Sequence, residues 1–136
     1  MKRELTLSAV PENIEKVNDF VNAYLEETGC PMKAQMQIGL ATEEAFVNIV
    51  HYAYDAKSGD ATIRIERREQ PDAVVITFTD QGKPYDPLQK EDPDVTLSVE
   101  ERQIGGLGVF LIKKMMDEVR YEYRDGKNVL QLQKLL

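Results

Sequence analysis

Residues that crosslink a chain or bind metal clusters are nearly absent from this sequence. Cys30 is the only cysteine and His51 the only histidine. An internal disulfide is therefore excluded, and the two side chains together give no cluster of metal ligands. We expect Cys30 to be buried and chemically idle.

Long apolar runs and an excess of positive charge are also missing. The amino-terminal segment, MKRELTLSAV, lacks the continuous apolar stretch of a signal peptide, and no run is long enough to span a bilayer. Lysine and arginine number 17 against 24 aspartate and glutamate residues, a formal net charge of -7. Because such a surface repels phosphate backbones and anionic lipids, we expect a cytoplasmic protein without direct contact to nucleic acid or membrane.

The residues that are present suit one compact domain over residues 1–136, since 42% of them are hydrophobic. Periodicity and turn residues predict first a strand over Lys2–Ser8 and then helices over residues 11 to about 29 and 31 to about 54. Two strands follow, around residues 63–65 and 74–78, joined at Gln70 and Pro71. After an irregular segment over 81–103, the pattern predicts a helix over 109–116 and strands over 119–124 and 128–134, joined at Asp125 and Gly126. This order favours one largely antiparallel sheet with helices on one face, an α+β two-layer sandwich.

A polar cluster lies on the second predicted helix, in the segment ATEEAFVNIVHYAY. At ~100° per residue, Glu44, Asn48 and His51 fall within roughly a 60° arc, whereas apolar residues occupy the opposite side. Glu43 projects about 140° away from Asn48, so the wheel selects Glu44 as the partner of Asn48. The same pattern also suits a solvated helix face, and the cluster needs support from elsewhere in the chain.

Two further groups carry chemistry of a similar kind. Asp80, Gly82 and Pro84 follow an apolar strand in FTDQGKPYDP, where a carboxylate can accept a hydrogen bond from an amino group such as that of adenine. The run GGLG at residues 105–108 opens a helix, where successive backbone N–H groups bind anions. An Asp-x-Gly turn and a glycine hinge are the plain alternatives. The run is not a P-loop, because no Gly-Lys-Ser/Thr follows it.

Taken in this order, the three groups resemble the motifs of the Bergerat-fold (GHKL) ATPases. EEAFVNIVHYAY is similar to their N box, TDQGKPYDP to their first glycine box and ERQIGGLGVFLIKKMMDEV to their second. Within that superfamily the short chain is most similar to the anti-sigma-factor serine/threonine kinase branch. The resemblance implies a two-layer α/β sandwich of the histidine-kinase-like ATPase type, with a mixed, mainly antiparallel sheet, helices on one face and an ATP lid at about residues 84–108.

The resemblance also implies ligands, ATP and Mg²⁺, and a role for each matching residue. Asn48 would bind the metal, Glu44 would act as the base for the acceptor hydroxyl, Asp80 would bind the adenine amino group and Gly82 would lie beside the ring. The phosphates would be enclosed by Gly105, Gly106, Leu107 and Gly108, and Arg102 or His51 would add positive or hydrogen-bonding character there. The chain departs from the family pattern at Pro84, where a second glycine is often found, and at Asn128, where a threonine is expected.

The activity that the resemblance implies is transfer of the γ-phosphoryl group of ATP to a serine or threonine of a protein. The partner would be an anti-sigma-factor antagonist of the STAS type, with a sigma factor as the alternative partner, and the chain would form a homodimer. Two other functions stay open, a nucleotide-sensing interaction module without kinase activity and the catalytic domain of a histidine kinase. The histidine kinase is disfavoured because the chain begins almost directly with the ATPase domain and His51 sits at a site position.

Overall fold

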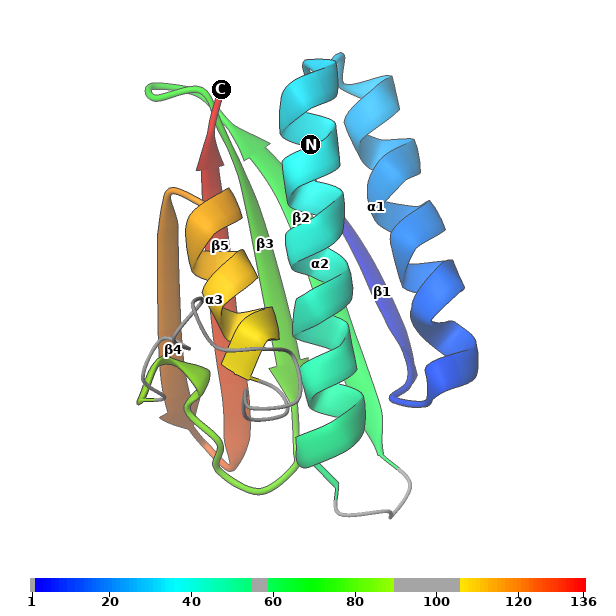
Figure 1. The fold of residues 1–136 in the computed structure, drawn as a ribbon. Coiled ribbons are helices and arrows are strands. Elements are labelled where there is room, and N and C mark those ends of the chain that lie inside the picture. The colour runs from blue at the N-terminus through cyan, green and yellow to red at the C-terminus, as the bar shows by residue number, and fades with distance from the viewer. Residues whose placement is uncertain (1, 55–58, 90–105) are drawn as a thin grey trace.

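The computed structural model describes residues 2–54, 59–89 and 106–136. Within these ranges one sheet carries all the helices on a single face (Figure 1). The helices are α1 (Ile14–Glu27), α2 (Met32–Tyr52) and α3 (Gly106–Met115), with short 3-10 turns η1 (Pro11–Asn13) and η2 (Pro87–Gln89). The strands are β1 (Lys2–Ser8), β2 (Asp60–Arg68), β3 (Ala73–Asp80), β4 (Glu118–Arg124) and β5 (Lys127–Leu135).

The five strands lie in the order β1-β2-β3-β5-β4, and each neighbouring pair is antiparallel. The expected α+β two-layer sandwich is thus confirmed. The sheet was expected to be mixed and mainly antiparallel, and the pairings described here are all antiparallel. Hairpins join β2 to β3 and β4 to β5, so neighbours in the chain become neighbours in the sheet.

Alternation along the strands explains why the helices cover only one face. Ile65 and Phe78 are buried against the helices, whereas Arg64 and Thr77, one residue away on β2 and β3, line the open face. Successive side chains of a strand point to opposite faces, so a single shift in register would exchange these two sets. The open face is charged and polar, and needs no second helical layer.

Helix boundaries differ from the expected ones in a way that matters for the site. The third helix was expected to begin after the glycines, at residue 109, but α3 begins at Gly106 and takes Gly108 into its first turn. The first turn of a helix has free N–H groups whatever its residues, so glycines there still present donors. None of the helices in the described ranges is long and apolar enough to cross a bilayer.

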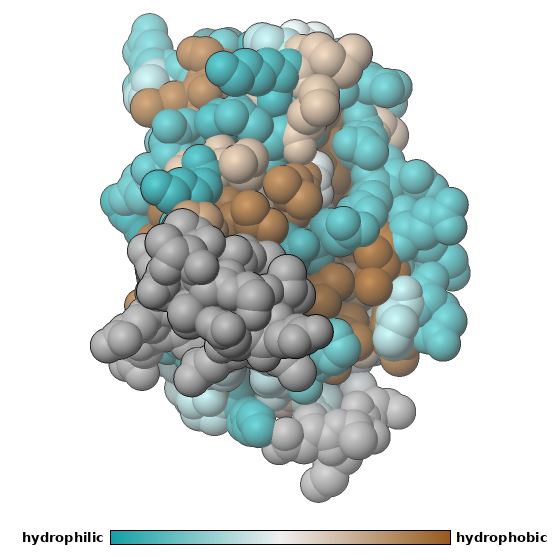
Figure 2. All heavy atoms as spheres, viewed as in Figure 1, coloured by the Kyte–Doolittle hydropathy of each residue, from teal (hydrophilic) through white to brown (hydrophobic). Residues whose placement is uncertain are grey.

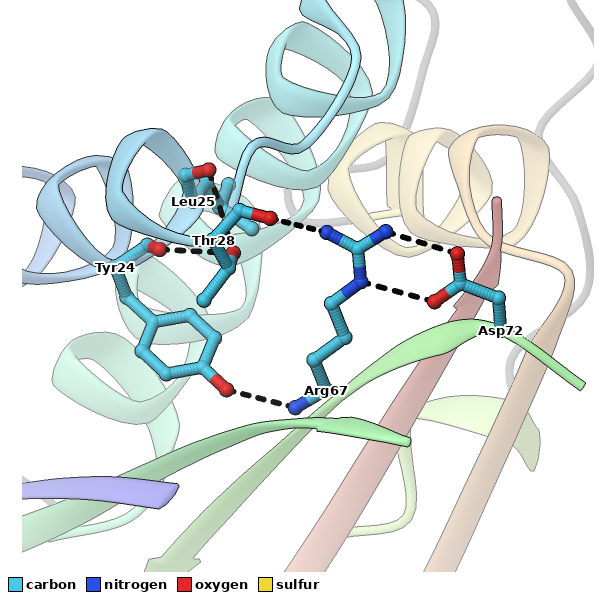
Figure 3. A network of polar contacts seen from close by, with 5 residues as sticks. All are labelled: Tyr24, Leu25, Thr28, Arg67 and Asp72. Carbon is cyan, nitrogen blue, oxygen red and sulfur yellow. Dashed lines mark hydrogen bonds and ion pairs between the residues drawn. The ribbon is translucent and has the colours of Figure 1, made fainter. Parts of the chain in front are cut away.

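The junction between α1 and α2 is fastened to the β2–β3 hairpin by a network around Arg67 (Figure 3). The Arg67 guanidinium binds both carboxylate oxygens of Asp72 and donates to the carbonyl of Thr28, while the Arg67 amide donates to the hydroxyl of Tyr24 at 2.7 Å. The Thr28 hydroxyl in turn donates to the carbonyls of Tyr24 and Leu25. The network holds the α1–α2 connection at one end of the sheet. The last turns of α2 lie at the other end (Figure 1).

Cys30 lies beside this junction and is buried, as expected. Burial raises the pKa of its thiol, and the nearby Arg67 offsets this only in part. A buried thiol with a raised pKa holds little reactive thiolate, so the structure agrees with an idle cysteine.

Candidate nucleotide-binding site

A small pocket opens where α2 ends beside the last residues of β3, at the lower end of the view in Figure 1. Its walls come from α2, the β3–η2 segment and the β4–β5 hairpin. They comprise Ala45, Asn48, Ile49, Ala53, Phe78, Asp80, Tyr85, Pro87, Tyr121, Asn128 and Leu130. The expected residues Asn48 and Asp80, 32 positions apart in the sequence, are brought to one pocket.

Asp80 is the buried carboxylate of this pocket, with 6% of its surface exposed. Its Oδ1 accepts hydrogen bonds of 2.9 Å from the amide of Gly82 and from Nδ2 of Asn128. Burial raises the pKa of Asp80, and these two donors oppose that rise. In the part of the chain that the structure describes, both bonds end on Oδ1, so Oδ2 is the oxygen left to meet a ligand.

Asn128 lines the same pocket, although in the sequence it stood out only as a departure from the family pattern. Its Nδ2 donates to Asp80 and, at 2.8 Å, to the carbonyl of Lys83. Its Oδ1 accepts from the amide of Tyr85 at 3.1 Å and from the hydroxyl of Tyr121. One amide on β5 thus holds both the carboxylate and the loop that follows it.

Asn48 lies on α2 with only 9% of its surface exposed. Its Nδ2 is buried and finds no hydrogen-bond partner among the described residues. An unpaired buried amide is costly, and in a pocket it is a place where a polar ligand would be stabilised. The two ends of an asparagine amide can exchange by rotation, so either can face that ligand.

The polar face predicted for α2 is therefore not a uniform solvated face. Asn48 is buried, Glu44 is half-buried and His51 is exposed and does not line the pocket. The exposure of these side chains differs because α3 packs against part of α2, whereas the last turn of α2 extends past α3 (Figure 1). The His51 ring lies 6.2 Å from that of Tyr52, and its expected role toward the phosphates stays a prediction.

Glu44 lies under the first turn of α3. A Cβ built on Gly108 would come within 2.7 Å of Glu44 Oε2, so only glycine fits there without moving the carboxylate. Burial raises the pKa of Glu44, and the charge of Glu43 adds to the rise. Glu43 itself turns the other way and accepts a 3.2 Å hydrogen bond from Asn18 of α1, as the helical wheel predicts.

Gly82 is fixed by a close approach to the end of α2. A Cβ at this position would lie 2.1 Å from the carbonyl oxygen of Ala53, and the amide of Lys83 donates to the same oxygen at 2.9 Å. The loop after β3 thus satisfies one of the last carbonyls of the helix. Of the other expected phosphate-binding residues, Arg102 and Gly105 lie outside the described residues, as do most of the expected lid and the side chain of Leu107.

The pocket is narrow in this structure. Its free volume is about 30 Å³, against the roughly 300 Å³ or more of typical ligand pockets. Tyr85 forms part of the wall and stacks on Tyr52, with ring centroids 4.9 Å apart and planes 14° apart. A ligand as large as a purine would fit only if the walls of the pocket moved apart.

The donor set fits a nucleotide and a metal ion held mainly by phosphate. Within the described ranges there is no group of three or more His, Cys, Asp or Glu side chains that could hold a metal by itself. Mg²⁺ is commonly bound by one or two protein oxygens together with phosphate oxygens and water. The unpaired amide of Asn48 and the glycine-lined turn above Glu44 suit that arrangement.

Comparison with known proteins gives the family of this domain. Residues 7–134 match the model of the histidine kinase-like ATPase domain family. The chain belongs to this family. It is 29% identical over 133 residues to the serine-protein kinase RsbW of Listeria monocytogenes, covering 95% of this chain and 84% of that protein. It is 32% identical over 100 residues to the serine/threonine-protein kinase BtrW of Bordetella bronchiseptica, covering 74% and 70%.

Solved structures agree on the fold. The RsbU and RsbW domains of Rv1364c from Mycobacterium tuberculosis superpose with a TM-score of 0.71 at 18% identity, over all of this chain and 32% of that one. The SiaB-SiaC complex from Pseudomonas aeruginosa gives a TM-score of 0.57 at 19% identity, over 97% and 89%. Together the relatives confirm the predicted family and the predicted class of enzyme, a serine/threonine protein kinase.

Proposed function

We propose that this protein is an ATP-dependent serine/threonine kinase with an anti-sigma regulatory role, which phosphorylates an anti-sigma-factor antagonist of the STAS type. Relatives named serine-protein kinase RsbW support the class of reaction. The observation that carries the proposal is the position of Glu44. It is a half-buried carboxylate with a raised pKa, one helical turn before Asn48 and against Gly108.

Asp80 is the residue that would select the base. Its Oδ1 is held by Gly82 and Asn128, so Oδ2 can accept from the exocyclic amino group of adenine. A buried carboxylate that is already oriented by two donors makes that hydrogen bond without rearranging. Gly82 would act through its amide, which orients Asp80, while its missing side chain makes room for the end of α2.

Asn48 is the residue that would hold Mg²⁺ through its amide oxygen, with the remaining positions filled by phosphate and water. When bound, the metal neutralises charge on the phosphates during transfer. The first turn of α3, from Gly106, offers backbone N–H groups to the same phosphates. These roles of Asn48, Gly106 and Gly108 belong to the proposal.

Glu44 is the residue that would receive a proton. The acceptor hydroxyl oxygen forms a bond to the γ-phosphorus of ATP while the bond from that phosphorus to the β,γ-bridging oxygen breaks, leaving ADP. The hydroxyl proton passes to the Glu44 carboxylate. A raised pKa makes this carboxylate a stronger base than an exposed glutamate.

A sigma factor as a second, sequestered partner and a homodimeric assembly are part of the same proposal, and rest on the resemblance to the anti-sigma branch. The alternative, a sensor without kinase activity, draws support from the narrow pocket. If ATP must displace the Tyr52–Tyr85 stack to enter, binding alone changes the surface beside α2, and that change could select a partner.

One experiment separates the kinase from the sensor. STAS-type proteins from the same organism are recovered by pulldown with the purified chain, and phosphosites are mapped after incubation with ATP and Mg²⁺. Glu44→Gln should bind ATP nearly as well as the unaltered protein but transfer phosphate about 10²- to 10⁴-fold more slowly, the usual contribution of a general base. Glu66→Gln, at a partly buried site on the open sheet face where Glu66 pairs with Arg68, is the control and should keep its activity. Equal transfer by Glu44→Gln would remove Glu44 as the base, and no transfer by the unaltered chain would leave the sensor.

A further inference from the structure

The amino-terminal half of α2 exposes large apolar side chains on one face. Met32 and Met36 are each 71% exposed and Leu40 is 37% exposed. Their spacing of four residues places them in a row along the helix. Figure 2 looks onto the helical layer, and apolar surface is visible along α2 among hydrophilic side chains. A connected apolar row of this kind on a helix surface commonly marks a site of contact with another molecule.

The row borders a groove between α1 and α2 of about 490 Å³. Gly39 lies in the groove, and a Cβ there would come within 3.7 Å of Asn22 Oδ1 on α1. The missing side chain keeps the groove open between the two helices. Its lining residues come from α1 and α2, and a groove between two helices can seat a third helix lying alongside them.

The polar part of the groove offers hydrogen-bond acceptors and negative charge. Glu26 and Glu43 line it, and none of its lining residues is a lysine or arginine. Asn18 Oδ1 is buried there and accepts no hydrogen bond within the described residues. A partner that brings positively charged donors would therefore find complementary groups on this wall.

The row also points toward the candidate base. Glu44 follows Leu40 by one helical turn, about 6 Å along the axis. A segment seated on the row would therefore end close to Glu44 and the first turn of α3. Docking and chemistry would then share a single rigid helix.

We propose that this groove docks the phosphoacceptor protein through an amphipathic helix, whose aliphatic side chains pack on Met32, Met36 and Leu40 and whose lysine or arginine side chains meet Glu26 and Glu43. Naming the occupant as the phosphoacceptor rests on the proposed kinase function. The groove itself rests on the exposure and charge of its own residues. Methionine suits such a surface because its flexible side chain adapts to different aliphatic partners.

The first test uses labelled peptides and needs no natural partner. A fluorescein-labelled helical peptide of 14 residues with leucines on one face and lysines at the flanks is titrated with the full chain and followed by anisotropy. It should bind at least about tenfold more tightly than the same peptide with glutamate in place of lysine, or than a shuffled peptide whose leucines share no face. Equal affinity for the three peptides overturns the proposal.

Two double variants then locate the binding. Met32→Gln with Met36→Gln keeps side-chain length and helix propensity at exposed positions, and should lower affinity for the lysine peptide at least about tenfold. Glu26→Gln with Glu43→Gln should weaken it severalfold and flatten its dependence on salt. Circular dichroism and ADP affinity that match the unaltered chain confirm that the fold is intact. Unchanged peptide affinity in both variants places the binding elsewhere and overturns the proposal.

A kinetic arm separates failure of the docking from failure of the kinase function. With a phosphorylated acceptor in hand, the methionine double variant should raise KM for that protein about tenfold and leave kcat unchanged. An unchanged KM overturns the docking but leaves the kinase. Peptide binding without phosphorylation of any acceptor would support docking in the groove and contradict the proposed kinase function. A dimer that dissociates in the methionine double variant on sedimentation would assign the face to self-association, and would also overturn the proposal.

Discussion

Asn128 and Asp80 lie opposite one another on β5 and β3, and the Asn128 amide donates a 2.9 Å hydrogen bond to the Asp80 carboxylate. The same amide binds Lys83 and Tyr85 in the loop after β3. The direction of the carboxylate is therefore set by a strand that sequence order places 48 residues later. In the proposed function, Asn128 would act on the nucleotide through Asp80, as a positioning residue.

Removal of this amide should cost both stability and affinity. Asn128→Leu keeps the volume but removes the hydrogen bonds that Asn128 makes with the Asp80 carboxylate, the Lys83 carbonyl and the Tyr85 amide. We expect a loss of about 2 to 4 kcal/mol in the free energy of unfolding. ADP affinity should fall about tenfold or more. Asn128→Thr restores a hydroxyl donor and should recover part of both. Urea denaturation and calorimetry measure the two effects, and an Asn128→Leu protein with normal ADP affinity would show that Asp80 needs no positioning.

Asp80→Asn should weaken nucleotide binding and stabilise the fold at neutral pH. The pKa of Asp80 is raised by burial, so the folded state holds a proton more tightly than the unfolded state. Ionised Asp80 therefore costs stability above its folded pKa, and the cost disappears as pH falls toward the ordinary value of 3.8. We expect Asp80→Asn to be more stable by about 1 kcal/mol at pH 7, with the difference shrinking as pH falls. ADP affinity should drop about 10- to 100-fold. A pH-independent stability difference would contradict the assignment.

Asn48→Ala should weaken Mg²⁺-dependent ATP binding without destabilising the fold. The variant removes a buried donor that has no partner among the described residues and places a better helix former on α2, so unfolding should cost the same or up to about 1 kcal/mol more. ATP affinity in Mg²⁺ should fall about tenfold or more, and ATP affinity in EDTA much less. Titrations in the two buffers measure this, and losses of the same size in both would exclude a metal ligand at this position.

Gly82→Ala should lower the stability of the fold, whereas Gly108→Ala should lower the rate of phosphotransfer. The added methyl at position 82 meets the backbone of Ala53 at 2.1 Å, which cannot give way, so the fold should lose several kcal/mol. At position 108 it meets the flexible end of Glu44 at 2.7 Å, and alanine favours a helix by about 1 kcal/mol. Gly108→Ala should therefore fold normally yet transfer phosphate more slowly. Thermal melts and phosphotransfer assays on both variants distinguish the cases, and full activity of Gly108→Ala would remove Glu44 from the reaction.

The phosphotransfer rate should fall on acidification earlier than an ordinary glutamate would predict. The pKa of Glu44 is raised above its usual 4.5 by burial and by Glu43, and a general base works only when deprotonated. The acid limb of kcat against pH should therefore lie above 4.5. Glu43→Gln removes the second cause and should move that limb to lower pH. A limb at the ordinary value would show that Glu44 does not control the rate.

Much of the fold could be predicted from local patterns in the sequence. Asp125 and Gly126 predict a two-residue hairpin turn, and both take positive φ, 55° and 75°. The wheel also separated Glu44 from Glu43, because the direction of a helical side chain follows from spacing alone. These features depend on residues that are near one another in the chain.

Features that depend on distant pairing could not be predicted in the same way. The burial of Asn48 is set by neighbours from other elements, and the role of Asn128 by its register with Asp80. Nothing near Asn128 in the sequence encodes which residue lies opposite it. Two signals were available in the sequence: Asn128 stands where the family pattern has a threonine, and it alternates in phase with the apolar residues Leu130 and Leu132.

The turn at Asp125 and Gly126 leads directly into β5, which carries Asn128. Asn128 lies two residues beyond it, and side chains alternate between the two faces of β5. A one-residue shift of β5 against β3 would carry Asn128 to the open face and bring a neighbour opposite Asp80, with every amino acid of the site still encoded. The pairing of β5 with β3 is thus as much a part of the candidate site as the residues that line it.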